Sequence, residues 1–240
     1  MAIPRRIIQT HRSADVMPEL RASWIEQHPD YDYRFFTDEQ CRAFVAEQLP
    51  GLLATYDALP LPVQRADLFR YAAVYELGGV YADVDTVCCA PLHGYVDLAQ
   101  DRLFAGMEMT PAHYGSGIAN YIRDYCSPYQ LLQWTFCAPA RHPVLAALLD
   151  RIRFLVSRIP PAYLVHCSRE NRFTLELTGP MLFTQVLNEF LSGSRQGPVA
   201  VLARLAWGAL PPEQARADLA GQIKVRHLFL GHWKSGAPAT

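Results

Sequence analysis

The sequence lacks the features of a nucleic-acid-binding or membrane-spanning protein. Only two lysines occur in 240 residues, and the formal net charge is −1. The chain therefore offers no general electrostatic attraction to nucleic acid or to an anionic membrane. No apolar run reaches the roughly 18 residues that span a bilayer, and the N-terminus has no apolar signal-peptide stretch. We expect a cytoplasmic protein with no transmembrane segment and no nucleic-acid partner.

Paired cysteine motifs are also missing. The six cysteines form no Cys-x-x-Cys pair, and the adjacent Cys88 and Cys89 are too close for an easy mutual bridge. We expect reduced and mostly buried thiols and no zinc cluster. With 50% hydrophobic and 19% charged residues, the composition is that of an ordinary globular protein. The length predicts one domain, residues 1–240, with a substantial core.

Strand and helix signals alternate along the chain, and this predicts an α/β fold with a mostly parallel central sheet flanked by helices. Thr37 and Gln40 form a capping box, which marks the start of one helix. Strands are expected at residues 5–11, 31–37 and 80–85, with a last strand in 224–235. Helices are expected at residues 18–29, 38–49, 63–77 and 142–159, the last of them packed on the core.

The segment LGGVYADVDTV, Leu77 to Val87, runs an apolar strand into two carboxylates, Asp83 and Asp85. On an extended strand both would point to one side, and their repulsion would raise the pKa of each. A divalent cation is the usual compensation, and Mg²⁺ or Mn²⁺ prefers oxygen ligands while keeping positions for substrate phosphates. Ligands of open α/β sheets lie at the carboxyl ends of strands. The pair therefore suggests a metal-assisted diphosphate site, with two solvated loop aspartates as the alternative.

The helix before this strand carries a second pair of charges. Asp67 and Arg70 are three residues apart and share a helical face, away from the apolar stripe of Leu68, Ala72 and Tyr75. An acid and a base on a helix that leads directly into the carboxylate strand could reach the same cleft. The alternative is a plain surface ion pair, which contributes little to stability.

Six segments occur in the order seen in DXD-type sugar transferases: IPRRIIQTH, SWIEQHPDYDYRFFTDE, QRADLFRYAAVYELGGVYADVDT, QWTFCAPARHPVL, TGP and HLFLGHW. On these segments the chain resembles glycosyltransferase family 32, which includes the fungal initiating α-1,6-mannosyltransferase. It is more distantly similar to the large glucosylating bacterial toxins. The match runs from about Ile3 to Trp233. The resemblance implies a GT-A (Rossmann-like) fold, a nucleotide-sugar donor, Mn²⁺ or Mg²⁺, and retention of anomeric configuration.

The resemblance also implies roles for individual residues. Asp83 would contact the donor sugar or ribose, Asp85 would bind metal, and Trp233 would close over the donor. The catalytic group would be Asp67, Arg70, Asp83 and Asp85, and the metal ligands would be Asp83, Asp85 and His227. The donor would lie against Ile8, Gln9, Thr10, Asp67, Arg70, Tyr81, Ala82, Asp83 and Trp233. The acceptor side would hold Gln133 and Trp134.

We predict a retaining glycosyltransferase that moves a sugar from a nucleotide sugar to a glycan or other hydroxyl acceptor. The mannosyltransferase-like QWTF segment favours GDP-mannose, with a UDP-hexose as the other option. No carboxylate nucleophile is evident, so front-face displacement is the working hypothesis. A nucleotide-sugar-binding module or a nucleotide-sugar hydrolase stays open. Phosphatases of the haloacid-dehalogenase type share a DVDT motif, but they need a lysine followed by acidic residues, and none follows Lys224.

Overall fold

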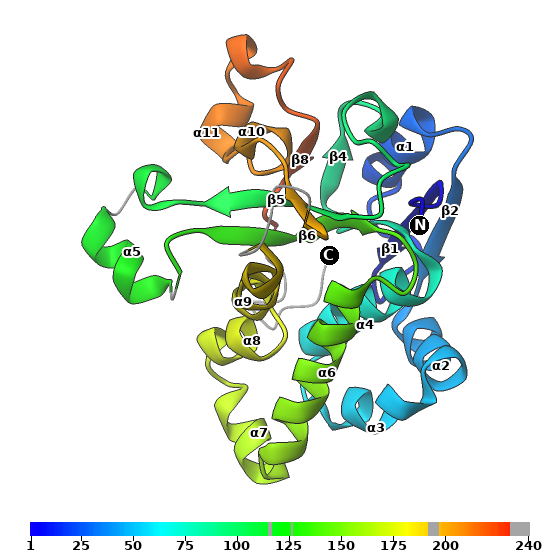
Figure 1. The fold of residues 1–240 in the computed structure, drawn as a ribbon, viewed down its shortest axis with the longest axis vertical. Coiled ribbons are helices and arrows are strands. Elements are labelled where there is room, and N and C mark those ends of the chain that lie inside the picture. Colours follow the sequence, from blue (N-terminus) through cyan, green and yellow to red (C-terminus); the bar gives the residue numbers. More distant parts are fainter. Residues whose placement is uncertain (115–116, 126, 192–196, 231–240) are drawn as a thin grey trace.

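A six-stranded sheet with the order β2-β1-β3-β6-β5-β7 organises the fold (Figure 1). The structure is a computed structural model and describes residues 1–114, 117–125, 127–191 and 197–230. The strands of this sheet are β1 (Arg6–Thr10), β2 (Asp32–Phe36), β3 (Gly79–Ala82), β5 (Leu103–Met109), β6 (Gln130–Ala138) and β7 (Val199–Val201). A separate two-stranded ribbon pairs β4 (Thr86–Cys88) with β8 (Val225–His227).

Only β6 runs against the other strands of the described six-stranded sheet. β1 pairs in parallel with β2 and β3, β5 pairs in parallel with β7, and β6 is antiparallel to β3 and β5. The expectation of a mostly parallel sheet is confirmed. Because β1, β3 and β5 point the same way, the residues that follow them gather at one edge of the sheet.

Helices flank the sheet and connect its strands. The longer ones are α1 (Pro18–Gln27), α2 (Asp38–Gln48), α3 (Pro50–Ala58), α4 (Pro62–Leu77), α6 (Pro143–Arg158) and α9 (Pro180–Leu191). The shorter ones are α5 (Ile118–Asp124), α7 (Pro161–Cys167), α8 (Asn171–Leu177), α10 (Arg204–Trp207) and α11 (Pro211–Gln214). Single 3₁₀ turns lie at Leu92–Gly94, Pro111–His113 and Ala217–Leu219.

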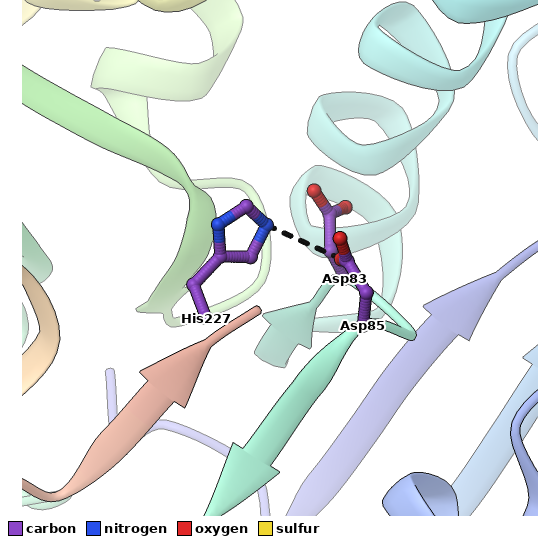
Figure 2. Close-up of side chains that lie close together, drawn as sticks. All are labelled: Asp83, Asp85 and His227. Carbon is purple, nitrogen blue, oxygen red and sulfur yellow. Dashed lines mark ion pairs between the residues drawn. The ribbon is translucent and has the colours of Figure 1, made fainter. Parts of the chain in front are cut away.

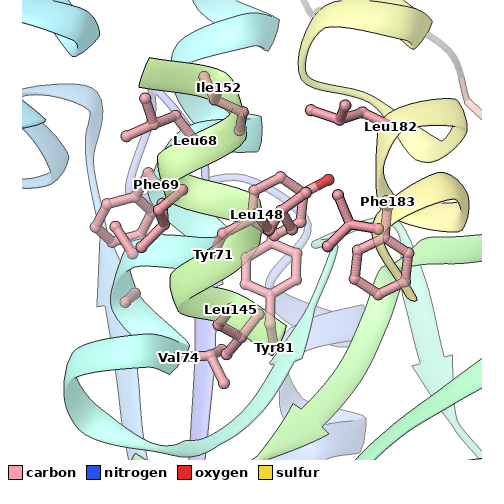
Figure 3. Packing of buried hydrophobic residues seen from close by; sticks show 14 of the residues in the cluster. Leu68, Phe69, Tyr71, Val74, Tyr81, Leu145, Leu148, Ile152, Leu182 and Phe183 are labelled. Atoms are coloured by element: carbon pink, nitrogen blue, oxygen red, sulfur yellow. The ribbon is translucent and has the colours of Figure 1, made fainter. Parts of the chain in front are cut away.

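The main core lies between the sheet and helices α4, α6 and α9 (Figure 3). Tyr71 of α4 stacks on Phe183 of α9 with ring centroids 5.8 Å apart, and both rings contact Phe136 of β6. Alternation along each strand sends Ile8 and Tyr81 to this face. Burial of these large side chains fixes α4 against the sheet, and α4 carries Asp67 and Arg70.

The opposite face of the sheet packs on α1, α10 and the β4–β8 ribbon. Ile7 and Val80, the strand neighbours of Ile8 and Tyr81, belong to this second cluster, as do Trp24 and Trp207. The indole Nε1 of Trp24 donates to the hydroxyl of Thr86 in β4 at 3.0 Å. This packing holds the ribbon beside the end of β3.

Most of the expected elements agree with the structure. The last strand, expected in 224–235, is β8 (Val225–His227), and 231–235 lie outside the described residues. The helices and strands expected up to residue 77, and the helix at 142–159, are confirmed within a few residues, as is the capping box of Thr37 and Gln40. The strand expected at residues 80–85 ends at Ala82, so the prediction is wrong for 83–85. Cys41, Cys88 and Cys137 are buried free thiols, as expected. Among the residues that the structure covers, no helix has the length and apolarity needed to span a bilayer.

Candidate active site

A glycine closes α4 and sets how closely the helix approaches β3. Gly78 caps the helix with φ +63°, a backbone conformation that L side chains rarely adopt. A Cβ at this position would lie 2.7 Å from the backbone nitrogen of Ala140 and 2.7 Å from Pro4 Cδ. Glycine is therefore required by both conformation and space. The tight junction carries the chain from the helix of Asp67 and Arg70 into the strand that ends beside Asp83.

Asp83 and Asp85 lie in a turn between β3 and β4 rather than on an extended strand. The hydroxyl of Thr86 donates to the carbonyl of Asp83, which closes the turn. The strand prediction failed here because the chain leaves β3 to pair with a distant strand, β8. The hydroxyl of Tyr81 donates to Asp83 Oδ1 at 2.7 Å, so one carboxylate oxygen is held from within β3.

The β4–β8 ribbon brings a histidine to this turn. Thr86 is in register with His227, so the imidazole lies next to Asp85 (Figure 2). His227 Nε2 is 3.2 Å from Asp85 Oδ1, and the N–H of Leu230 donates to Asp85 Oδ2 at 3.2 Å. Ligand atoms of Asp83, Asp85 and His227 all lie within 4.8 Å of one another. We call these three residues the acidic cluster.

The acidic cluster fits a divalent cation. Two carboxylates supply the oxygen ligands that Mg²⁺ and Mn²⁺ prefer, and a neutral imidazole nitrogen is a common metal ligand in proteins. The side chains of Asp83, Asp85 and His227 are 24%, 16% and 12% exposed. They are therefore largely withdrawn from water but still reachable from outside. Among the described residues, this is the one group of three or more such side chains close enough to hold a metal.

The two aspartates respond differently to their surroundings. Burial raises the pKa of Asp83, and the charge of Asp85 raises it further, against the opposing charge of Arg70. Burial also acts to raise the pKa of Asp85, but His227 and the Leu230 N–H outweigh it, so the pKa is lowered. For His227, burial acts to lower the pKa, but the bond and charge of Asp85 raise it. The expectation that each aspartate raises the other's pKa is thus right for Asp83 and wrong for Asp85.

Arg70 joins Asp67 to the acidic cluster. Its Nη1 is 3.2 Å from Asp83 Oδ1, and its Nη2 is 3.2 Å from Asp67 Oδ1. The guanidinium carbon lies 4.7 Å from the ring centroid of Tyr81, within cation–π range. Asp67 is 1% and Arg70 6% exposed, so the alternative of a surface ion pair is wrong. Burial raises the pKa of Asp67 to about 7, although Arg70 and two hydrogen bonds act to lower it.

Trp134 and Glu108 form one wall of the acidic cluster. The indole of Trp134 stacks on the imidazole of His227, with centroids 4.7 Å apart and planes 12° from parallel. Its Nε1 donates to Glu108 Oε1 at 3.3 Å. Sequence reasoning missed Glu108, which lies near the end of β5, at the same edge as Asp83. An acidic residue in the otherwise apolar strand segment LFAGMEM is the signal that could have found it.

The expected donor-binding residues of β1 and β3 are mostly inside the protein. Ile8 and Ala82 are fully buried. The amide of Gln9 donates to the carbonyl of Asp83 at 3.2 Å and accepts from the hydroxyl of Tyr33 at 2.8 Å. Thr10 donates to the carbonyl of a β2 residue. Of these side chains, Gln9 supports the turn of Asp83 from behind. The donor contacts expected of all of them stay predictions.

Two further expectations concern the acceptor side and the C-terminus. The amide of Gln133, predicted on the acceptor side, donates from Nε2 to Asp67 Oδ1 at 3.0 Å. Its acceptor role, like that of Trp134, stays a prediction. Trp233, predicted to close over the donor, lies outside the described residues.

Comparison with known proteins identifies the region that contains the turn. Residues 15–105 match the family model described as a glycosyltransferase sugar-binding region containing a DXD motif. The matched range includes α1, α4, β3 and the Asp83–Asp85 turn, and the Asp-Val-Asp sequence of this turn fits the DXD pattern.

Relatives of the chain carry mannosyltransferase names. The chain is 28% identical over 211 residues to the initiation-specific α-1,6-mannosyltransferase of Schizosaccharomyces pombe, covering 83% of this chain and 51% of that protein. Over 90 residues it is 44% identical to inositol phosphoceramide mannosyltransferase 2 of the same species, covering 36% of this chain and 26% of the relative. The chain thus spans about half the length, or less, of these curated relatives.

The fold also has a counterpart among solved structures. The ligand-free glycosyltransferase domain of the YGT toxin superposes with a TM-score of 0.50 at 10% identity, over 84% of this chain and 80% of that chain. At this identity the likeness concerns the fold alone. The mixed, mostly parallel sheet flanked by helices is the GT-A arrangement, as the sequence predicted.

Proposed function

We propose that this chain is a metal-dependent glycosyltransferase that moves a hexose from a nucleotide sugar to a hydroxyl of a glycan or other acceptor. The observation that carries the proposal is the acidic cluster. Its two aspartates lie within the residues that match a DXD sugar-binding region, His227 joins them from β8, and Arg70 is paired with Asp83. Two carboxylates, an imidazole and a guanidinium at the end of a parallel strand suit a divalent cation and a diphosphate. The ion is Mn²⁺ or Mg²⁺.

In this proposal Asp83, Asp85 and His227 hold the ion, and Arg70 meets the diphosphate. A bound divalent cation supplies charge neutralisation on the leaving diphosphate. The planar fork of Arg70 offers several N–H donors, and its Nε is buried with no hydrogen-bond partner in the described part of the chain. Tyr81 and Asp67 restrain the guanidinium, so little reorganisation is needed when a phosphate arrives.

The transfer step in this proposal is a front-face displacement. The acceptor oxygen forms a bond to the anomeric carbon, and the bond from that carbon to the diphosphate oxygen breaks. The electron pair of the broken bond stays on the diphosphate, and the acceptor proton passes to a diphosphate oxygen. Configuration is retained because attack and departure use the same face. The protein contributes positioning and electrostatic stabilisation of the leaving group.

GDP-mannose is the donor that we favour. The relatives described above are named mannosyltransferases, which supports mannose as the transferred sugar. A UDP-hexose is the second choice. The acceptor is a hydroxyl of a glycan or of another molecule, since the proposed chemistry requires only a nucleophilic oxygen.

A donor screen tests the proposal. The protein is heated with GDP-mannose, UDP-glucose, UDP-galactose or UDP-N-acetylglucosamine, each with and without Mn²⁺ or Mg²⁺. We expect one donor to raise the melting temperature only when metal is present, because a ligand that binds the native state stabilises it. The same donor should release nucleoside diphosphate over time. Absence of both effects for every donor would contradict the proposal.

Product analysis separates transfer from the alternatives. With the preferred donor and a mannoside acceptor, NMR of the product should show a new glycosidic bond with the anomeric configuration of the donor. Release of free sugar alone, with an acceptor present, would favour a nucleotide-sugar hydrolase. Stabilisation without any turnover would favour a binding module. An inverted linkage would exclude front-face displacement.

A further inference from the structure

A buried polar group behind the acidic cluster holds both oxygens of Asp67. Thr178 Oγ1 donates to Asp67 Oδ2 at 2.9 Å, and Gln133 Nε2 donates to Asp67 Oδ1 at 3.0 Å. Thr178 is fully buried and Gln133 is 9% exposed. With Arg70 at 3.2 Å from Oδ1, the carboxylate has three partners from inside the protein. Little of its hydrogen-bonding capacity is left for a donor sugar.

Tyr71 completes this group. Its hydroxyl is within hydrogen-bond reach of the Thr178 carbonyl at 2.9 Å, and it also contacts Gln133 Oε1. Its ring is fixed by stacking on Phe183 in the main core (Figure 3). Three segments far apart in sequence thus meet at Asp67: α4, β6 and the turn between α8 and α9.

The turn between α8 and α9 is built to present Thr178. A Cβ on Gly179 would lie 2.7 Å from Leu175 Cα, so only glycine allows the chain to turn this closely. Pro180 then begins α9, at a helix position that needs no N–H donor. The Thr-Gly-Pro motif therefore places one hydroxyl in a fixed position under Asp67. A turn that only started a helix would need no hydroxyl at this position.

The position of Asp67 sets the position of Arg70. Arg70 Nη2 contacts Asp67, and Nη1 contacts Asp83 at 3.2 Å and donates to the carbonyl of Gln133 at 3.3 Å. Because the guanidinium is planar, fixing both Nη atoms fixes the whole fork. A shift of the Asp67 carboxylate would therefore turn Arg70 relative to the acidic cluster.

We infer that Thr178 is a positioning residue of the site: with Gln133 and Tyr71 it orients Asp67, and through Asp67 it orients Arg70 toward the diphosphate. For the diphosphate, the inference rests on the proposed function. In this inference Asp67 acts on the diphosphate through Arg70. Gln133 belongs to this support and not to the acceptor side.

Three substitutions test the inference. Thr178→Val removes the hydroxyl and keeps the shape, while Thr178→Ser restores a donor. Thr184→Val is the matched control: Thr184 is also buried, and its hydroxyl accepts from the Leu131 N–H at 2.9 Å and donates to the Pro180 carbonyl at 2.7 Å. No hydrogen bond joins it to Asp67 among the described residues. Melting temperatures of all variants are recorded first.

The first measurement needs no ligand. In ¹⁵N NMR, the Arg70 Nη–H signals should be resolved in the wild-type protein, because two carboxylates restrain rotation of the guanidinium. Thr178→Val should broaden or average them, whereas Thr178→Ser and Thr184→Val should leave them resolved. Unchanged signals in folded Thr178→Val, or equal averaging in Thr184→Val, would overturn the positioning role.

The second measurement is the Kd of GDP and of UDP with Mn²⁺. Thr178→Val should raise the Kd of the nucleotide on the order of tenfold, because a misplaced Arg70 loses most of its contact with the diphosphate. Thr178→Ser and Thr184→Val should remain close to wild type. Wild-type affinity in Thr178→Val would overturn the link to the diphosphate. If the wild-type protein binds neither nucleotide, the proposed function fails, while the NMR result still decides whether Thr178 positions Arg70.

Discussion

At the scale of single residues, the site depends on how each side chain is held from behind. Arg70 lies between Asp67 and Asp83, Asp83 also accepts from Tyr81, and His227 packs flat against Trp134. These supports are hydrogen bonds and stacking contacts in largely buried surroundings. In such surroundings, a charged group that loses its partner costs far more than it does at the surface.

Arg70→Lys should reduce donor turnover nearly as much as Arg70→Ala, on the order of 10²-fold in kcat/KM. Lysine carries a single ammonium group and cannot contact Asp67 and Asp83 with two separate Nη groups as arginine does. Arg204→Lys is the control, since Arg204 also grips one carboxylate, Glu213, with both Nη atoms. Steady-state kinetics on folded protein gives the answer. If Arg70→Lys keeps most of its activity, Arg70 acts only as a point charge.

Trp134→Leu should weaken Mn²⁺ binding roughly tenfold, because His227 loses the flat surface that orients it. Trp134→Phe keeps an aromatic face and should bind Mn²⁺ nearly as the wild type does, although the donor to Glu108 is lost. Titration of Mn²⁺ by electron paramagnetic resonance measures the Kd. Trp207→Leu removes another buried indole, on α10, and serves as control. If Trp207→Leu weakened Mn²⁺ binding equally, the effect of Trp134→Leu would come from lost stability and not from the orientation of His227.

At the scale of elements, local sequence signals predicted most of the fold. Helix periodicity, the Thr37–Gln40 capping box and the glycines after α4 are local features, and the elements that they mark are present. The turn of Asp83–Asp85 was missed because Thr86 leaves the sheet to pair with His227. That pairing joins residues more than a hundred positions apart, and no local pattern encodes it.

The site, too, could be predicted where its residues are close in sequence and could not where they are distant. Asp67, Arg70, Asp83 and Asp85 belong to one continuous motif, so sequence reasoning could find them together. Thr178 entered the sequence analysis only as part of the TGP segment, because its hydrogen bond to Asp67 joins positions 111 residues apart. Glu108 was missed because a lone glutamate on a strand carries no motif. The supporting groups of the site are therefore a product of tertiary structure.

Gly78→Ala should destabilise the protein by about 1–3 kcal/mol or more, because φ +63° with ψ 174° is a region that only glycine occupies freely. The added Cβ would also approach the Ala140 backbone at 2.7 Å. Gly51→Ala is the control: Gly51 lies in α3, where an added Cβ would meet no atom within 4 Å. We expect that change to stabilise by up to about 1 kcal/mol. Urea unfolding gives the change in the free energy of unfolding for each variant. Similar changes in Gly78→Ala and Gly51→Ala would contradict a tight α4–β3 junction.

At the scale of the whole molecule, segments from both ends of the chain converge on one edge of the sheet. β1 supports the turn, α4 supplies Arg70, and β8 supplies His227 (Figure 1). Stability and site geometry are therefore linked, and conditions that loosen the fold should also disperse the site. Acidic pH should be one such condition, because the protein buries neutral histidines away from the site.

Acid should destabilise the protein in part through His142. Burial lowers the pKa of His142 to about 4, whereas an unfolded histidine titrates near 6.5. Between these pH values the unfolded state binds the extra proton, so the free energy of unfolding falls as pH decreases from about 6.5 to 4. The stabilising contribution is fully present above pH 6.5 and is lost as pH falls to 4.

The difference between wild type and His142→Leu isolates this effect. Urea unfolding at a series of pH values should show that the free energy of unfolding of the wild type falls more steeply than that of the variant below pH 6.5. Taking the difference cancels the titration of Asp67 and of other groups common to both proteins. Parallel curves would mean that His142 does not titrate with the expected shift.

The most direct test of the central claim, a metal-dependent transferase site at the Asp83–Asp85 turn, is the metal dependence of nucleoside diphosphate release by Asp85→Asn. Asp85 is 16% exposed at a turn outside the two hydrophobic clusters, so the variant should keep a melting temperature close to wild type. Asp218→Asn, which changes an exposed carboxylate paired with Arg216, should behave as wild type. We predict that Asp85→Asn loses Mn²⁺- or Mg²⁺-dependent turnover while staying folded. A folded Asp85→Asn protein with wild-type rate and metal dependence would contradict the account.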